Sequence, residues 1–471
     1  MVTNRLRVFT NMSQYRPIPI ALVAVLAFGV LLAPMPGETG ANTVAVLALT
    51  VLIIGLMATN GLPEFQVSAL YFALALIFQV APAGVVLSSL RSSAFWLIAG
   101  GVVLGIAAIK TGLGRRVAEV FVRHLSRSFP RLIAGIVFGA VVLAFLIPAA
   151  IARMIILMPI VLALADRLGF QPGSRGRTGM ALAVGVASFY IPMTILPSNF
   201  PNVLLAGLAD RIYDVKVTYG EYLLMHFPVA GALKAVLLVG VICWLFGERT
   251  VEAAAEPAPA AALGPEGKRL AVIVMATVGL WASDFIHGIS PGWIAVAAAV
   301  VCLLPGIGVM SVTDFKGRAS GFVALFNVAT VISLGAVIAE SGAGGLIAAK
   351  LFTITDFRPG EPAYAFGMFS AMNIVMGLFA TLPGTIAVLA PFAGQVADAT
   401  ALPLMTVLMT VANGYSTVFL PYQAPPIVAG LRLGGVSLAD GTKLTVTLSA
   451  LTVVVLLPLT YLWWRVLGYF G

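Results

Sequence analysis

The chain alternates long apolar runs with short polar joints along nearly its whole length. Windows of about 18 or more residues carry little or no charge, as in 43–59, in 235–246 with its flanks and in 444–464. Such uniform runs predict helices, because strands of an outer-membrane barrel would alternate apolar and polar residues. The pattern predicts an all-α polytopic membrane protein of about eleven transmembrane helices plus two re-entrant hairpins and two broken helices.

Two apolar runs are interrupted near their middle by proline and polar residues. Residues 195–207 read ILPSNFPNVLLAG and residues 419–430 read FLPYQAPPIVAG, so Leu-Pro opens each break and Ala-Gly closes it. Proline removes a backbone N–H group and its ring clashes with the preceding turn, so a straight helix has no use for these residues. The runs therefore predict two broken helices, over 179–208 and 404–431.

Two further apolar runs predict re-entrant hairpins. Residues 132–166 are long enough for two short helices, but basic clusters flank both ends, so this segment is expected to enter from the cytoplasm and return there. Pro148 lies near its middle and would help to form the tip. The counterpart in the second half is 363–398, with Pro383 and Gly384 near its middle, and it is expected to dip from the outside.

The order span, hairpin, broken span and span occurs twice, with opposite entry sides. IKTGLG at 109–114 is echoed by AESGAG at 339–344, and PIVLALAD at 159–166 is echoed by PFAGQVAD at 391–398. This order predicts an inverted-topology repeat. The predicted units are a cytoplasmic N-terminus (1–16), a first half (17–247), a cytoplasmic linker (248–267) and a second half (268–471).

Composition supports a membrane location, and charge predicts the orientation. Hydrophobic residues make up 60% of the chain and charged residues 10%, a balance that would leave a soluble domain with a large exposed apolar surface. The bias of Lys and Arg among the loops predicts a multi-pass protein of the bacterial inner membrane with a cytoplasmic N-terminus. The net charge of +9 is explained by loops that face anionic lipid, so nucleic acid is not predicted as a partner.

The breaks are the first candidates for chemistry. Helix N-termini attract anions and helix C-termini attract cations, so two breaks and two hairpin tips at mid-membrane can hold an anionic substrate and a coupling ion. Amide and hydroxyl groups at the breaks can serve both ligands. The candidate substrate-binding residues there are Ser198, Asn199, Asn202, Tyr422 and Gln423. The alternative is that these side chains only cap the half-helices.

Arg153 follows the tip of the first predicted hairpin. A charge at that depth is costly unless it faces water, a counter-ion or a substrate. The fork of donors on a guanidinium matches the two oxygens of a carboxylate. Arg153 is therefore predicted to bind substrate, and the alternatives are an internal salt bridge or a side chain that reaches the interface.

Other ionisable residues lie in or beside apolar runs. Lys110 and Glu340 end spans at corresponding positions of the repeat, and they are expected to be interfacial anchors or a packing pair. His226 and Lys234 are expected near the outer end of one span, with a proton-coupling role left open. The chain shows no nucleotide-binding glycine loop, metal constellation or nucleophile-base arrangement, so no enzyme, metal site or organic cofactor is predicted.

With these motifs, the chain resembles the divalent anion/sodium symporter family of the ion transporter superfamily from Pro17 onward. Members carry a hairpin followed by a broken helix in each half, with a motif like Gly-Thr-Pro-Pro-Asn at the breaks. The matching stretches here are SNFPN at 198–202 and QAPPI at 423–427, and a family Thr-Gly pair is matched by 111–112 and, as Ser-Gly, by 341–342.

The resemblance implies a function and an assembly. It implies a homodimeric secondary transporter that moves a small anion, such as a di- or tricarboxylate, by elevator-type alternating access. In this family the mobile unit holds the hairpins and broken helices, and the coupling ion here would be Na⁺ or H⁺.

Family hairpin tips usually read Ser-Asn-Thr, touch the substrate carboxylate and help to frame the sodium sites. The matching positions here are Ala149, Ala150 and Ile151 in the first half, and Thr381, Leu382 and Pro383 in the second half, with Thr385 close behind. By this resemblance, Thr381 and Thr385 join the substrate-binding candidates. The coupling-ion candidates are Ala149, Ala150, Asn199 and Pro383. An arginine in place of neutral donors also suits a proton-coupled carrier, an exchanger or a uniporter.

Two further functions stay open. One is an anion exporter or antiporter, as in the arsenite-efflux and sodium/proton-antiporter branches of the superfamily. Strict sodium/proton antiport normally needs an intramembrane carboxylate, and none is obvious in this sequence. The other is a permease subunit that needs a partner protein, because an obligate soluble partner leaves no sure mark on a single chain.

Overall fold

The structure of the chain is a computed structural model. It describes residues 17–33, 40–59, 61–124, 128–248, 262–315, 320–346, 357–379 and 382–470. Within these ranges every regular element is a helix and no strand occurs. The prediction of an all-α fold is therefore confirmed for the described part of the chain. The predicted N-terminal unit and most of the predicted linker lie outside it.

The helices follow one another closely, and short 3-10 or π segments join several of them. Before residue 248 they are α1 (Pro17–Leu32), α2 (Ala41–Thr59), α3 (Glu64–Ile77), α4 (Ala83–Val86), η2 (Ser88–Arg91), α5 (Ser93–Lys110), α6 (Leu113–His124), α7 (Phe129–Leu146), α8 (Ala150–Arg167), α9 (Arg175–Tyr190), η3 (Ile191–Thr194), η4 (Leu196–Ser198), α10 (Phe200–Tyr213), α11 (Tyr219–His226), η5 (Phe227–Leu233) and α12 (Lys234–Phe246). After residue 262 they are α13 (Pro265–Ala282), α14 (Asp284–His287), α15 (Pro291–Leu303), η6 (Val312–Phe315), α16 (Ser320–Glu340), α18 (Pro362–Phe379), α19 (Leu382–Leu389), η7 (Ala390–Phe392), α20 (Ala393–Thr400), α21 (Leu404–Tyr415), η8 (Pro421–Gln423), α22 (Pro425–Gly434), α23 (Leu438–Leu451), η9 (Thr452–Leu456) and α24 (Leu457–Val466).

Several helical stretches are long and apolar enough to cross a membrane. In the described ranges there are 5 of them, and two run through π segments, the 28 residues from α11 to α12 and the 29 residues from α23 to α24. Shorter apolar helices include α1, α3, α15, α18 and α21. The fold is therefore that of a multi-pass membrane protein, whereas the number of spans stays a prediction.

The predicted hairpins coincide with helix pairs. α7 and α8 cover 132–166, and the chain between them turns at Ile147 to Ala149, around Pro148. α18 to α20 cover 363–398, with residues 380–381 outside the described ranges. The side of the membrane from which each pair enters, and the inverted repeat itself, stay predictions.

Each predicted broken helix is interrupted, and prolines begin the segments that follow. α9 ends at Tyr190, and then η3, η4 and α10 each carry a proline at their first or second position. α21 ends at Tyr415, and both η8 and α22 begin with proline. Proline suits a helix start because the N–H it lacks has no intrahelical acceptor there. The first interruption therefore begins several residues before the Leu-Pro motif.

Two glycines end the helices that precede the hairpin regions. Gly112 follows α5 with φ +70°, and Gly342 follows α16 with φ +72°. These left-handed values suit glycine, which has no Cβ to clash. The two echoed sequences IKTGLG and AESGAG therefore share a backbone turn at the same position.

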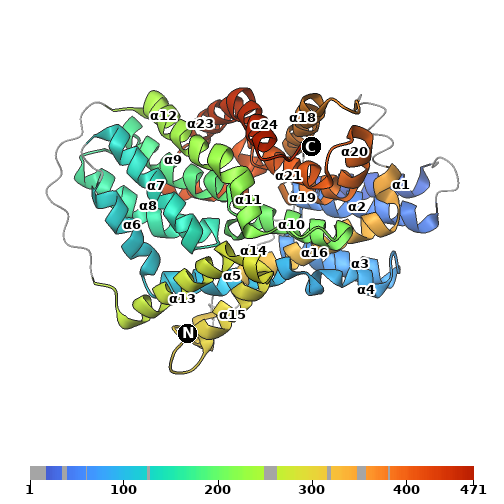
Figure 1. The fold of residues 1–471 in the computed structure, drawn as a ribbon, viewed down its shortest axis with the longest axis horizontal. Helices are drawn as coiled ribbons and strands as arrows, with labels where there is room; N and C mark the ends of the chain where they lie inside the picture. The colour runs from blue at the N-terminus through green and yellow to red at the C-terminus, as the bar shows by residue number, and fades with distance from the viewer. Residues whose placement is uncertain are drawn as a thin grey trace.

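The molecule is elongated, and two glycines allow a close helix crossing near its middle. α6 to α8 lie at one end of the longest axis and α1 to α4 at the other, with α10 between them (Figure 1). α5 and α15 pack together. A Cβ on Gly100 would lie 2.5 Å from the main chain of Ala295, and a Cβ on Gly292 would lie 2.0 Å from the carbonyl oxygen of Ser93. Small residues are thus required for the backbones to approach so closely.

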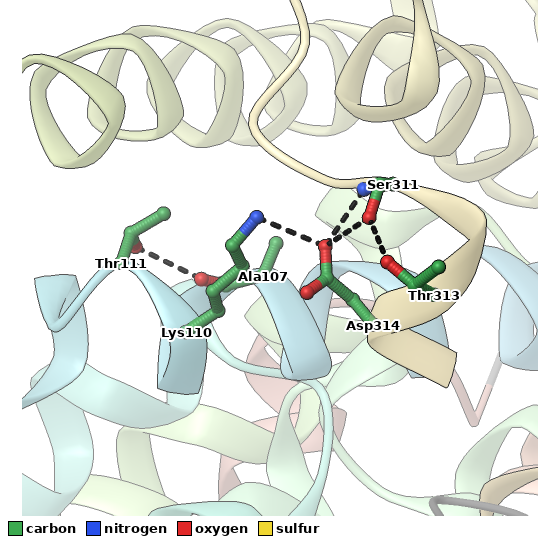
Figure 2. A network of polar contacts seen from close by, with 6 residues as sticks. All are labelled: Ala107, Lys110, Thr111, Ser311, Thr313 and Asp314. Atoms are coloured by element: carbon green, nitrogen blue, oxygen red, sulfur yellow. Dashed lines mark hydrogen bonds and ion pairs between the residues drawn. The ribbon is translucent and has the colours of Figure 1, made fainter. Parts of the chain in front are cut away.

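A polar joint connects the end of α5 to the loop before α16. The Lys110 ammonium donates to Asp314 Oδ2 at 2.9 Å, and the same oxygen accepts from the Ser311 amide at 2.7 Å (Figure 2). The Ser311 amide and the Lys110 ammonium lower the pKa of Asp314 from its ordinary 3.8 to about 2. Lys110 therefore pairs with Asp314 and not with Glu340, which is exposed.

The α5–α15 crossing generates a stability prediction. Gly100→Ala should lower the free energy of unfolding by about 1–3 kcal/mol, because the added methyl overlaps the main chain of α15. The matched control is Gly279→Ala in α13, where a Cβ would meet nothing within 4 Å and alanine raises helix propensity by up to about 1 kcal/mol. Thermal unfolding midpoints of the purified variants check both. Equal midpoints for the two variants would contradict the proposed crossing.

The joint at Asp314 generates a pH prediction. Because the folded-state pKa is depressed, the carboxylate contributes stability above its ordinary pKa of 3.8, and this contribution disappears as the pH falls through about 2. The thermal midpoint of the wild type should therefore exceed that of Asp314→Asn at neutral pH, and the difference should shrink between these two values. A difference that is independent of pH over this window would contradict the joint.

Candidate functional site

The two helix breaks free main-chain groups that need partners. Ending a helix leaves the carbonyls of its last turn without intrahelical N–H donors, and no water replaces those donors inside a membrane. The first break lies between α9 and α10, and the second lies between α21 and α22. At both breaks, side chains from several elements donate to the freed carbonyls. These side chains and the carbonyls that accept from them form the polar set at the breaks, which is the candidate functional site.

Arg153 joins the first hairpin to the first break. Its side chain is fully buried, and its guanidinium donates to the carbonyl oxygens of Ile147 at 2.5 Å, Ser188 at 2.8 Å and Ser198 at 3.1 Å, and to Ser198 Oγ at 3.2 Å. None of these four acceptors carries a negative charge, and Nε has no acceptor in the described part of the chain. The positive charge is thus held in place by dipoles and is not neutralised by an acid.

Ser198, Asn199 and Asn202 supply the remaining hydrogen-bond donors to carbonyls at the first break. Their side chains are buried, and they donate to carbonyls on α7, at the end of α9 and within the break itself. Asn199 Nδ2 also lies 3.4 Å from the sulfur of Met193. The remaining bonds are Ser198 Oγ to Ala144 at 2.6 Å, Asn199 Nδ2 to Phe189 at 3.2 Å, and Asn202 Nδ2 to both Pro192 and Ile195 at 2.9 Å.

The second break repeats this design with different residues. Gln423 is buried, donates to the carbonyl of Gly377 at 2.6 Å and accepts from the amide of Leu420 at 2.7 Å. Tyr422 is more than half exposed, and its hydroxyl donates to the carbonyl of Leu378 at 2.7 Å. Both acceptor carbonyls lie in the last turn of α18. In each half, therefore, the residues of the break hold the end of a helix from the adjacent predicted hairpin.

Three tyrosines connect the two halves of the chain. Tyr415 donates to Asn202 Oδ1 at 3.1 Å and shares a hydrogen bond of 3.1 Å with Tyr222, whose hydroxyl donates to the carbonyl of Met193 at 2.8 Å. Tyr190 donates to the carbonyl of Val418. These three tyrosines were not among the predicted site residues. Tyr190 and Tyr415 nevertheless end α9 and α21 at equivalent positions just before the breaks.

The hairpin-tip residues that the family resemblance singled out differ in burial, and one of them lies outside the described residues. Ala149 precedes α8 and Ala150 begins it, and the carbonyl of Ala149 accepts from the amide of Arg153 at 3.1 Å. Thr385 is buried on α19, and Pro383 is half-buried beside it. Thr381 lies outside the described residues. The structure therefore brings together Arg153, Ser198, Asn199 and Asn202 at the first break, and it groups Tyr422 with Gln423 at the second.

The prediction that Lys234 lies near the outer end of a span is wrong. Lys234 occupies the middle of the 28-residue stretch from α11 to α12, directly after the π segment η5, and not a position near the outer end. Its side chain is fully buried. The ammonium donates to the carbonyl of Ser416 at 3.1 Å and lies over the ring of Tyr190 at 5.2 Å. His226 is also buried, at the other end of η5.

Comparisons with known proteins agree with this architecture. The family model of the sodium:sulfate symporter transmembrane region matches residues 16–470. A membrane protein of Cupriavidus necator is 26% identical over 403 residues, which are 82% of this chain and 77% of that protein. The L-tartrate/succinate antiporter of Escherichia coli K12 is 25% identical over 406 residues, which are 80% of this chain and 79% of that protein.

A solved structure shares the fold at low sequence identity. MtrF of Neisseria gonorrhoeae, described within a class of antimetabolite efflux pumps, superposes with a TM-score of 0.52 over 96% of both chains. The two sequences are 14% identical. This likeness concerns the arrangement of helices alone.

The second break generates a prediction about stability. Gln423→Leu should lower the free energy of unfolding by about 1–3 kcal/mol, because the Gly377 carbonyl and the Leu420 amide both lose their partner. Gln171→Leu, in an exposed loop, is the control and should change the thermal midpoint little. If Gln423→Leu unfolds at the same temperature as the wild type, the hydrogen bonds of Gln423 to Gly377 and Leu420 do not stabilise the second break.

Proposed function

Because the chain belongs to the family of the sodium:sulfate symporter transmembrane region, we propose that it moves a di- or tricarboxylate across the bacterial inner membrane by elevator-type alternating access. Family membership confirms the resemblance to divalent anion/sodium symporters and makes the chain a membrane anion transporter. The family and the names of the relatives indicate a transporter and not an enzyme.

Arg153 is the observation that carries the proposed substrate class. Its guanidinium lies in the protein interior where the first hairpin meets the first break, and its bonded partners are neutral oxygens. A buried charge without a counter-ion is costly, so the site favours an anion that supplies the missing charge. A carboxylate could reach the free Nε–H group or replace the contacts to Ser198.

The proposed substrate site lies between the two breaks and the two hairpin tips. Hydroxyl and amide groups there would orient the carboxylates beside Arg153, after exchanging some of their contacts to carbonyls. The proposed substrate-binding set is Arg153, Ser198, Asn199, Asn202, Thr381, Thr385, Tyr422 and Gln423.

Two features support movement of the hairpins and broken helices as one unit. Each break is hydrogen-bonded to its adjacent hairpin, through Ser198 in the first half and Gln423 in the second. The helices before the hairpin regions end at the left-handed turns of Gly112 and Gly342, where a short flexible joint could absorb a change in backbone angle. The homodimer and the cytoplasmic N-terminus remain part of this proposal.

Two kinds of coupling have support. The family description implies Na⁺ as a coupling ion, whose proposed ligand positions are Ala149, Ala150, Asn199 and Pro383. Anion exchange is the second candidate, because Arg153 already places a fixed cation on the carbonyls of the first break. A relative that shares most of the chain length is named as a tartrate/succinate antiporter. The likeness to an efflux pump concerns the fold and favours neither kind of coupling.

The test is uptake of labelled succinate by proteoliposomes of the purified protein. An inward sodium gradient, choline in place of sodium, and internal succinate in choline form the three arms. Stimulation by sodium alone would support symport, and stimulation by internal succinate alone would support exchange. The same arms are then run with labelled citrate and labelled tartrate. If none of the three anions is taken up in any arm, the proposed substrate class is wrong.

Arg153→Met should reduce this transport about tenfold or more, since charged hydrogen bonds contribute roughly 1.5–3 kcal/mol. Arg153→Lys should recover part of the loss, because it keeps the charge but has three donors on a point charge in place of the five donors of the rigid guanidinium fork. Arg167→Met, at the exposed end of the same helix α8, is the control and should transport normally. Transport by Arg153→Met at the wild-type rate, in a folded protein, would remove Arg153 from the site.

A further inference from the structure

Lys234 carries a second positive charge into the polar set at the breaks. Its ammonium is fully buried and donates to the carbonyl of Ser416, the C-cap residue directly after α21. The C-terminus of a helix bears partial negative charge, so this position suits a cation. The ring of Tyr190 offers its π face on another side of the ammonium, at 5.2 Å from the centroid.

The contacts of Lys234 leave part of its binding capacity unused. An ammonium group has three N–H donors, and in the described part of the chain it makes one hydrogen bond and no ion pair. A buried ammonium with so few partners is costly. An anion that approached the second break would supply the missing charge and acceptors.

Lys234 is the counterpart of Arg153 at the other break. Arg153 donates to Ser188 in the last turn of α9, and Lys234 donates to Ser416 at the end of α21. The two cations come from different elements, the first from the hairpin helix α8 and the second from the stretch after α10. Both cations nevertheless contact the last turn of α9. Arg153 donates to the Ser188 carbonyl, and Lys234 lies over the Tyr190 ring.

The π segment η5 gives Lys234 a special place in its helix. η5 covers Phe227 to Leu233 and ends directly before Lys234. The wider π turn rotates the following residues relative to a regular α-helix, and such segments are frequent at functional sites. Without that rotation, a lysine in an apolar span would be expected to extend toward an interface.

We propose that Lys234 is a specificity-determining residue that makes the site select dianions over monoanions. This inference rests on the proposed function. Arg153 and Lys234 supply two fixed positive charges, one at each break, and a dicarboxylate carries one negative charge for each. A monoanion of the same size leaves one of them without a counter-charge. The alternative is that Lys234 only caps α21, in which case its loss would affect all substrates equally.

The experiment compares succinate with succinamate, which has the same length but one carboxylate. Uptake of each labelled anion is measured in proteoliposomes of the wild type, Lys234→Gln and Lys234→Arg, in whichever arm of the succinate test drives uptake by the wild type. Gln can still donate to the Ser416 carbonyl but carries no charge, whereas Arg keeps the charge. The matched control is Lys443→Gln, an exposed lysine that also lies over an aromatic ring, that of Phe246.

The expected result is a change in the ratio of the two transport rates. The wild type, Lys234→Arg and Lys443→Gln should prefer succinate. In Lys234→Gln the succinate-to-succinamate ratio should fall about tenfold, as loss of one charged contact implies. If Lys234→Gln fails to fold, the near-isosteric Lys234→Met is measured in the same way.

Three results would overturn the inference without touching the proposed function. They are an unchanged ratio in the neutral variants, an equal loss of transport for both anions, and a wild type that transports succinate without preference over succinamate. If the wild type takes up no anion in any arm, with sodium or with internal succinate, it is the proposed function that fails.

Discussion

Inside hydrocarbon, a main-chain carbonyl without a hydrogen-bond donor costs several kcal/mol, and the rest of this structure depends on meeting that requirement at two helix breaks. Prolines begin the helical segments that follow each interruption, and each proline lacks a backbone N–H donor. Side chains from the hairpins, from the opposite half and from the stretch 219–246 then supply the donors that the backbone lacks. Because each cap reaches a different element, satisfying the carbonyls also brings these elements together.

The nature of the donor varies around the site in a way that matters for chemistry. Most freed carbonyls receive a neutral amide or hydroxyl, as from Asn202 or Tyr222. At the ends of α9 and α21 the donors also include a guanidinium and an ammonium. Neutral caps complete the local hydrogen bonding, whereas cationic caps complete it and leave a net field. Under the proposed function, the charged caps are the positions where an anion would gain most from this field.

The sequence was sufficient to predict the helical class and the two breaks and to single out Arg153, because each rests on a local signal: an apolar run, a proline or a charge beside a tip. The tyrosine caps could not be predicted. Tyr415 and Asn202 are far apart in the chain, and their meeting depends on how the helices pack. Lys234 was predicted near the end of a span, but it lies in the middle of the 219–246 stretch, where its acceptor is the Ser416 carbonyl of the other half, a partner that no local signal reveals.

The hydrogen-bonded run Asn202–Tyr415–Tyr222 spans both halves of the chain. Each member satisfies a polar atom of the next, so a substitution at one position leaves an orphaned group in the other half. The two halves are consequently not interchangeable modules. A change at Asn202 or at Tyr415 therefore alters the hydrogen bonding of the other residue, and a chimera that takes one half from a relative inherits only part of the run.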